Sequence, residues 1–397
     1  MIFLGIYLFT FSILLFFALK YKPVADRFLE YRVYLDIIET GNLSNNRQGL
    51  YGLISSCPTV TFIPYVLNKY LHINKLIIFE IIPCFFYALM PSFCFLIARN
   101  FLSIGNSLIA SLFILSHFYF AFSPNMGRVS VALGFLSGAI WALLSGNIWL
   151  MALFSVLVVI SHYSTAYYSL FVLGSAWVYL FCKESISLDN INLSSLMVIL
   201  TLSLWWWMHY AAKYAGSICD NFVRQSLYFS SLTLKDSSAT KLNRFMSMDS
   251  REPVLRTAFG KGFRHFRLPQ RIEFFTSWIL AILVSYGTLI IVINGLTTEL
   301  YRLLIISSFI SILITLIIPH ISMFYGIIRV YFTSLIILAP CFVYGVKTIA
   351  GMLGIQEYFL SIPLVVLYFM CVSGILHSIF HIKKHNFLKK IVKDIWG

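Results

Sequence analysis

Two carboxylates lie directly behind the first apolar segment of the chain. That segment covers residues 2–19, and Asp26 and Glu30 follow it in an Asp-x-x-x-Glu arrangement. A carboxylate at a membrane boundary is costly unless it faces water, a partner or a substrate. In such a place it can deprotonate a hydroxyl group or hold a divalent metal on a phosphate. The pair is therefore the first candidate for catalysis. The alternative is a pair of solvated acids bound to Arg27 or Arg32.

Two arginines and a histidine interrupt apolar stretches further along the chain. Arg128 stands between two such stretches and Arg329 opens another. Arginine stays charged and binds phosphate through two nitrogens, so both are candidates for holding a phosphate. His162 and Tyr163 break a third stretch, where an imidazole can bond a substrate or exchange a proton. The alternatives are arginines that snorkel at helix ends and a histidine bonded to neighbouring Ser or Tyr side chains.

A basic stretch, 261–271, alternates cations with phenylalanine. It either grips a pyrophosphate or an anionic lipid surface, or it is a solvated loop. The secondary candidates are Arg264, Arg267, His320 and Tyr331. Structural or topological roles are expected for Glu80, Arg99 and His209. The seven cysteines show no metal-ligand spacing and are expected to be small core residues.

Composition places the chain in a membrane. Of its 397 residues 59% are hydrophobic and 11% charged, and the mean hydropathy is +0.85, whereas soluble domains carry about 25% charged residues. The apolar runs are continuous, which favours spanning helices over a β-barrel. In such a protein the net charge of +14 indicates anionic or phosphate-bearing lipids as partners, and not nucleic acid.

The pattern predicts an all-α polytopic membrane protein with about eleven or twelve transmembrane helices. They are expected near 2–19, 75–98, 102–123, 128–144, 147–160, 165–182, 192–212, 275–295, 301–318, 325–349 and 355–381.

The connections divide this single integral membrane domain, 1–397, unevenly. The first external loop, 20–74, repeats apolar residues at helical spacing and predicts an amphipathic helix on the membrane surface. Its stretch 51–69, with two prolines, suits a second interfacial helix. A long basic loop, 213–274, and a basic C-terminal tail, 382–397, complete the organisation. We expect a bacterial or archaeal plasma membrane with the candidate residues facing outward.

Several motifs, in the same order, resemble a widespread polytopic family that is grouped with the GT-C glycosyltransferases. The resemblance covers about residues 20–350, and its most specific elements are Asp-x-x-x-Glu-Tyr and Ser-His-Tyr-Ser. The motifs are Asp26-x-x-x-Glu30-Tyr31, Thr40-Gly41-Asn42, Ile63-Pro64, Ile78-Phe79-Glu80-Ile81-Ile82-Pro83, Met126-Gly127-Arg128, Ser161-His162-Tyr163-Ser164, and Arg329-Val330-Tyr331 with Leu338-Ala339-Pro340.

The resemblance implies a polyprenyl-phosphate or polyprenyl-pyrophosphate sugar donor and an essential acid just after the first span. It assigns that role to Asp26, with Glu30 as a helper or metal ligand, and it implies that 51–69 is a surface helix. Some GT-C enzymes carry a second acidic motif, but residues 124–128 supply no acid. A divalent cation is therefore an open possibility, and no cofactor is firmly expected.

Three functions follow as hypotheses. The first is a membrane glycosyltransferase that moves a sugar or oligosaccharide from a polyprenyl carrier onto a cell-surface polysaccharide. The second is an O-antigen-type repeat-unit polymerase whose catalysis uses Arg and His. The third is a flippase or transporter of lipid-linked oligosaccharides, against which the absence of an internal repeat counts. The expected partners are the polyprenyl-linked donor, the glycan acceptor, the bilayer and proteins of polysaccharide assembly.

Overall fold

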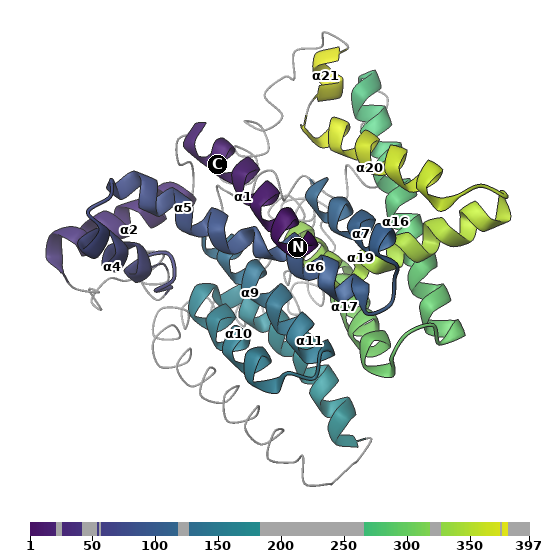
Figure 1. The fold of residues 1–397 in the computed structure, drawn as a ribbon, viewed down its shortest axis with the longest axis horizontal. Coiled ribbons are helices and arrows are strands. Elements are labelled where there is room, and N and C mark those ends of the chain that lie inside the picture. The colour runs from purple at the N-terminus through teal and green to yellow at the C-terminus, as the bar shows by residue number, and fades with distance from the viewer. Residues whose placement is uncertain are drawn as a thin grey trace, which may run out of the picture.

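The computed structural model describes residues 1–20, 26–41, 54, 57–117, 127–182, 266–317, 327–373 and 375–379. Every regular element within these ranges is an α-helix (Figure 1). The helices are α1 (Ile2–Lys20), α2 (Asp26–Thr40), α4 (Phe62–Leu71), α5 (Lys75–Tyr87), α6 (Leu89–Arg99), α7 (Ile104–Leu115), α9 (Gly127–Leu144), α10 (Ile148–Ser161), α11 (Tyr163–Cys182), α16 (Leu268–Asn294), α17 (Glu299–Ile317), α19 (Ile327–Met352), α20 (Glu357–Ser373) and α21 (Ile375–Ile379).

Five stretches of helix are long and apolar enough to cross a bilayer, which is compatible with an integral membrane protein. They are Lys75–Arg99, Gly127–Leu144, Leu268–Asn294, Glu299–Leu316 and Arg329–Met352. The helices α1, α7, α10 and α20 are also apolar but shorter. The total of eleven or twelve crossings thus stays a prediction, and the span expected at 192–212 lies outside the described residues.

The start of α16 differs most instructively from the boundary expected. The helix α16 begins at Leu268, inside the predicted 213–274 loop. Its first turn contains Pro269, and the side chain of Gln270 accepts a hydrogen bond from the Arg267 amide at 2.9 Å. These are start signals that a search for apolar runs overlooks, because the turn itself is polar. The predicted span 75–98 is confirmed as one candidate crossing, Lys75–Arg99, within which Ala88 marks the boundary between α5 and α6.

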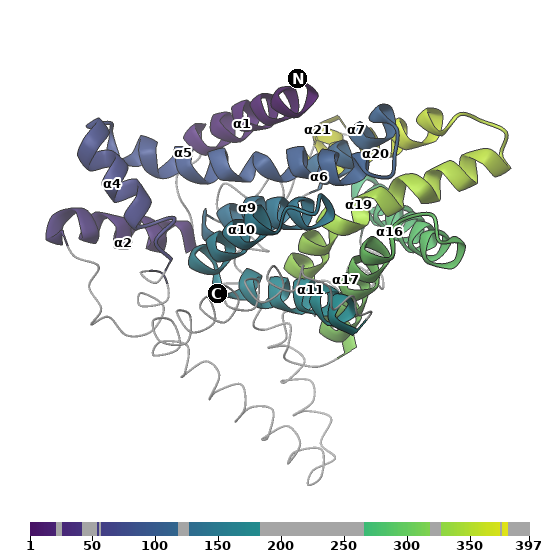
Figure 2. The same ribbon diagram turned by 60° about the horizontal axis from the view of Figure 1, so that its bottom comes forward.

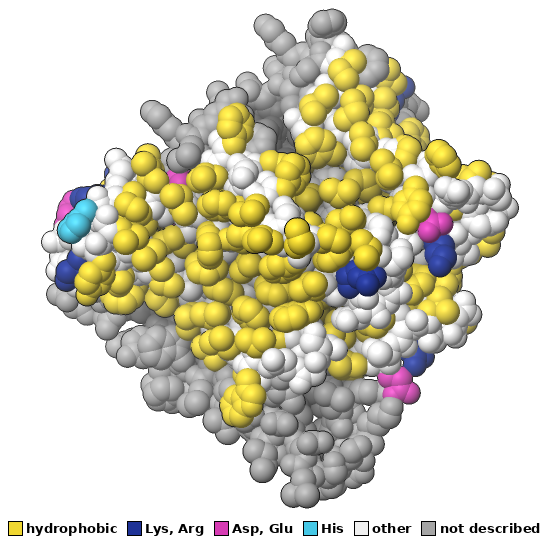
Figure 3. All heavy atoms as spheres, in the orientation of Figure 1, with side chains coloured by type: hydrophobic (Ala, Val, Ile, Leu, Met, Phe, Trp, Pro, Cys, Tyr) yellow, Lys and Arg dark blue, Asp and Glu magenta, His cyan; other side chains and the backbone are white. Residues whose placement is uncertain are grey.

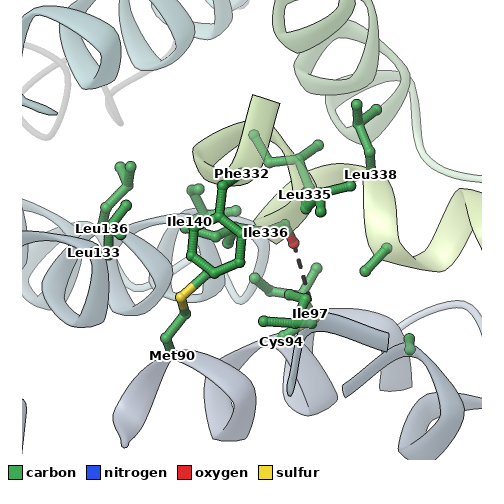
Figure 4. Close-up of a cluster of buried hydrophobic side chains, with 14 of the residues drawn as sticks. Met90, Cys94, Ile97, Leu133, Leu136, Ile140, Phe332, Leu335, Ile336 and Leu338 are labelled. Carbon is green, nitrogen blue, oxygen red and sulfur yellow. Dashed lines mark hydrogen bonds between the residues drawn. The ribbon is translucent and has the colours of Figure 1, made fainter. Parts of the chain in front are cut away.

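The helices α6, α9 and α19 pack around one apolar core (Figure 4). Met90 and Cys94 of α6 meet Leu136 of α9 and Ile336 of α19, and all four side chains are fully buried. In a bilayer such close packing, and not water exclusion, holds the helices together. The described cysteines whose side chains are placed are buried and form no disulfide bond with one another, namely Cys57, Cys84, Cys94, Cys341 and Cys371.

The order of α9, α10 and α11 brings three helix ends to one side. A short turn at 145–147 reverses the chain between α9 and α10, and the Asn147 side chain caps α10 by accepting the Leu150 amide at 3.1 Å. His162 alone separates α10 from α11. The three helices lie beside each other (Figure 2). The start of α9, the end of α10 and the start of α11 therefore share one end of the bundle.

The surface of the molecule carries a large hydrophobic area (Figure 3), which is compatible with contact to lipid. Figure 3 shows a broad hydrophobic face, with charged side chains near its edges. The helices α2 and α4 lie beyond the N-terminal end of α5 (Figures 1 and 2). Helices thus occur in the predicted first external loop, although their placement on a membrane surface remains a prediction.

Candidate functional site

The centre of the site is the carboxylate of Glu30, on the buried face of α2. Its Oε2 accepts a hydrogen bond from Nη1 of Arg27 at 3.1 Å. Its Oε1 accepts one from Nε of Arg128 at 2.8 Å and a longer one from the Arg128 backbone amide at 3.4 Å. All three side chains are buried. Both oxygens of Glu30 are thus engaged by arginines, so this acid is not the solvated residue that the sequence allowed.

Arg27 joins this acid to the helix α5. Its Nη2 donates to the carbonyl oxygen of Phe79 and lies 3.6 Å from Oε2 of Glu80. The centre of its guanidinium group stands 3.5 Å from the centre of the Phe79 ring, within the range of a cation–π interaction. A buried cation is tolerated only where counter-charges and acceptors replace water, and Arg27 has both.

The position of Gly127 makes this approach possible. It is the first residue of α9, and a Cβ atom placed there would overlap Nη1 of Arg27 and Oε2 of Glu30. The missing side chain lets the carboxylate reach the N-terminus of α9. A negative charge is favourable at that end, because the helix dipole and the unbonded amides point toward it.

His162 lies next to this ion-pair cluster, in the single-residue break between α10 and α11. Its Nδ1 accepts the Thr165 amide at 3.2 Å and lies 2.9 Å from the Thr165 hydroxyl. Since an amide can only donate, Nδ1 carries no proton, and the proton of the neutral ring is on Nε2. Burial holds the pKa of His162 well below 6.5, and the charges of Arg128 and Arg329 lower it further. The positive charge of this region therefore comes from the arginines.

Two arginines at helix starts act electrostatically on that histidine. Arg128 is in the first turn of α9, His162 immediately precedes α11, and Arg329 is in the first turn of α19. A chain of alternating charge runs from Glu80 through Arg27 and Glu30 to Arg128. Of the residues predicted from the sequence, the structure joins Glu30 to Arg128 and places His162 within electrostatic range of Arg128 and Arg329.

The other predicted residues are placed as follows. Asp26 begins α2, one turn before Glu30, and Tyr163 begins α11, but their side chains lie outside the described part of the structure. Tyr331 packs with its ring 5.6 Å from the ring of His117. Arg267 is exposed just before α16. Arg264 and His320 lie outside the described residues.

Two members of the site were not singled out for function from the sequence. Arg27 was considered only as a partner for solvated acids, and Glu80 was expected to be structural or topological. A signal for both existed: Glu80 interrupts an apolar helix and Arg27 is three residues before Glu30. An acid inside an apolar helix requires a cation nearby, and positions three apart share a helix face.

The donor set does not favour a divalent metal. Glu30 and Glu80 each pair with a guanidinium group, which competes with a cation for the carboxylate. Among the described residues, no three His, Cys, Asp or Glu side chains come together as possible metal ligands. Magnesium and calcium need several oxygen ligands at one point, which the described residues of this site do not supply.

A scan against protein-family models finds no match to this sequence, and no curated protein is significantly similar to it. The resemblance to the GT-C-associated family accordingly depends on short motifs alone.

Proposed function

We propose that this chain is a membrane glycosyltransferase that takes a sugar or oligosaccharide from a polyprenyl-phosphate or polyprenyl-pyrophosphate donor. The observation that carries the proposal is that Arg128 and Arg329, each in the first turn of an apolar helix, both lie within electrostatic range of His162. Arginine side chains and helix N-termini both favour a phosphate group. Such a site among apolar helices suits a ligand that has one phosphorylated end and one hydrocarbon end.

The reaction divides between acids and cations. The hydroxyl oxygen of the acceptor attacks the anomeric carbon of the donor sugar, and the bond from that carbon to the phosphate oxygen breaks. The electron pair of this bond leaves with the phosphate, whose added charge Arg128 and Arg329 stabilise. The hydroxyl proton passes to Asp26, the acid at the start of α2.

Glu30 has a positioning role in this scheme. Its two oxygens already accept hydrogen bonds from Arg27 and Arg128, so it aims the Arg128 guanidinium and does not take up the proton. The donor enters from the lipid and the acceptor from the water outside, on the side of α2 and α4. The proposed setting is a bacterial or archaeal plasma membrane with polysaccharide-assembly proteins nearby.

The variant Asp26→Asn tests the proposal in purified protein supplied with polyprenyl-linked donor and acceptor. Loss of a general base typically lowers the rate by 10²–10⁴-fold, so transfer should fall by at least ~100-fold. Glu39→Gln, an exposed acid on the same helix, is the matched control and should transfer like the unaltered protein. If the unaltered protein forms no glycan product but moves donor across a vesicle membrane, the enzyme assignment is wrong.

A second candidate is a repeat-unit polymerase that uses Arg and His without a carboxylate base. It is favoured by the position of His162, whose neutral ring lies within electrostatic range of both arginines. Full activity of Asp26→Asn together with loss of activity in Arg329→Gln would favour this reaction over the first.

A further inference from the structure

Glu80 differs from Glu30 in how its carboxylate is engaged. Its side chain is 6% exposed, and Oε2 stands 3.6 Å from Arg27, farther than either arginine stands from Glu30. Its Oε1 is buried and has no hydrogen-bond partner within the described part of the chain. An unsatisfied buried polar atom costs about 1–3 kcal/mol, more when the group is charged. Native structures keep such atoms mainly where water, an ion or a ligand binds.

An aromatic cluster adjoins this carboxylate. The rings of Tyr31 and Tyr34 pack on Phe79, the neighbour of Glu80, at centroid distances of 5.0 and 5.5 Å. Tyr31 is partly exposed, whereas Tyr34 is fully buried. Burial raises the pKa of Tyr31, and the charge of Glu80 raises it further, which places the phenol within electrostatic reach of the carboxylate. Tyr31 is thus the partly exposed member of an aromatic cluster that adjoins the buried carboxylate of Glu80.

The same cluster contains unused donors. Nε of Arg27 and the hydroxyl of Tyr34 are buried and have no hydrogen-bond partner in the described residues. A site with an anionic acceptor and neutral or cationic donors suits a ligand group that donates and accepts at once. A hydroxyl group does both, whereas a phosphate only accepts and would be repelled by Glu80.

We infer that Glu80 and Tyr31 form a binding subsite for the acceptor glycan, in which Oε1 of Glu80 accepts a hydrogen bond from a sugar hydroxyl and the ring of Tyr31 stacks on the sugar face. Sugars present an apolar C–H face beside their hydroxyl groups, and an aromatic ring next to a carboxylate matches both. The ion pairs through Arg27 and Glu30 connect this subsite to Arg128. The identification of the sugar as the acceptor rests on the proposed function, whereas the binding of a neutral sugar does not.

The test measures binding to the full chain in phosphatidylethanolamine–phosphatidylglycerol nanodiscs. The sugar probes are methyl glycosides of glucose, galactose, mannose and N-acetylglucosamine, whose binding is measured by saturation-transfer NMR. Farnesyl phosphate probes binding of the phosphate end. The variants are Glu80→Gln, Tyr31→Ala and Tyr31→Phe, with Glu39→Gln as an exposed control on α2. A thermal unfolding curve for each variant confirms folding.

The expected result is that at least one glycoside binds the unaltered protein and Glu39→Gln. Glu80→Gln and Tyr31→Ala should bind it at least ~10-fold more weakly, because each removes one of the two proposed contacts to the sugar. A tenfold loss corresponds to ~1.4 kcal/mol of binding free energy. Tyr31→Phe keeps the ring and should bind within ~3-fold of the unaltered protein, since stacking needs no hydroxyl. Farnesyl phosphate should bind Glu39→Gln as it binds the unaltered protein.

The inference is overturned if no glycoside binds the unaltered protein, or if Glu80→Gln and Tyr31→Ala bind it as well as the control does. Should Glu80→Gln fail to fold, Tyr31→Ala against Tyr31→Phe decides by itself. A third outcome is that glycoside binding depends on Glu80 but farnesyl phosphate does not bind. That result would support the sugar subsite and contradict the proposed lipid-phosphate donor.

Discussion

Oε1 of Glu30 accepts a hydrogen bond from Nε of Arg128 at 2.8 Å, although 98 residues separate the two in the chain. The contact joins α2, which follows the first apolar helix, to the start of α9. Because both groups are buried, each is the counter-charge that makes burial of the other tolerable. The acid behind the first helix and the cation at a later helix therefore form one structural unit.

Replacing Glu30 by Gln should destabilise the protein strongly. The amide keeps the shape but leaves Arg27 and Arg128 facing each other without a shared negative charge. Breaking a buried ion pair in this way typically costs 3–5 kcal/mol, so the loss should be about that size. Denaturant unfolding in detergent micelles measures it. Glu39→Gln serves as the control. Equal unfolding midpoints for the two variants would show that the ion pairs of Glu30 do not stabilise the fold.

Replacing Gly127 by Ala tests how closely the ion pairs approach α9. The new methyl group would occupy the space now filled by Nη1 of Arg27 and Oε2 of Glu30. Overpacking of this kind costs about 1–3 kcal/mol, and here it should also weaken binding of farnesyl phosphate through displacement of Arg128. Gly174→Ala is the control, because a Cβ there meets nothing within 4 Å. Unchanged stability and binding in Gly127→Ala would contradict the geometry.

Replacing Tyr168 by Phe tests a polar link among three apolar helices. The Tyr168 hydroxyl of α11 bonds Ser334 of α19 at 2.9 Å and Ser308 of α17 at 3.3 Å. Interhelical hydrogen bonds in membranes contribute about 0.6 kcal/mol on average and up to ~1.7. We expect a loss in that range, measured by the unfolding midpoint. Tyr70→Phe, at an exposed tyrosine, is the control and should change the stability by less than ~0.5 kcal/mol.

Acidification should weaken the fold through His162. Its folded pKa lies well below 6.5, so the unfolded chain takes up the proton first as the pH falls. The contribution of His162 to the free energy of unfolding is therefore fully present above about pH 6.5. Below that pH it declines by about 1.4 kcal/mol for each pH unit until the pKa of the folded state is reached.

The variant His162→Asn identifies this contribution. Asparagine can still accept the Thr165 amide as an N-cap, but it has no proton to gain. Its unfolding temperature should fall less between pH 7 and pH 5 than that of the unaltered protein. His72→Asn, at an exposed histidine, is the matched control for replacing an imidazole by an amide. Parallel pH profiles for His162→Asn and the unaltered protein would refute the assignment.

Helix positions followed from the sequence far better than the partners of polar side chains. Apolar runs locate α1, α9 and α10 to within one or two residues, because membrane-compatible helices need continuous apolar stretches. The start of α16 was misplaced because its first turn is polar. The division of α5 from α6 at Ala88 was missed because the apolar run continues across it.

The site followed from the sequence only as a set of isolated residues. Glu30, Arg128, His162 and Arg329 stood out, since charged and imidazole groups are rare in apolar chains. That Glu30 is held by Arg27 and Arg128 at once does not follow from residue spacing, because it depends on how α2 docks against α9. The roles of Gly127 and Glu80 depend on the same docking.

The glycines of α16 and α19 set the position of a distant charge. A Cβ on Gly287 would overlap the carbonyl oxygen of Cys341, and one on Gly345 would overlap that of Leu283. The two backbones thus touch directly, as in small-residue crossings of membrane helices. This approach fixes how closely α16 and α19 pack at that point, because any side chain at either glycine would push them apart. Arg329 lies on α19 more than three helical turns before Gly345. Its position therefore depends in part on a contact between two helices that involves no charged group.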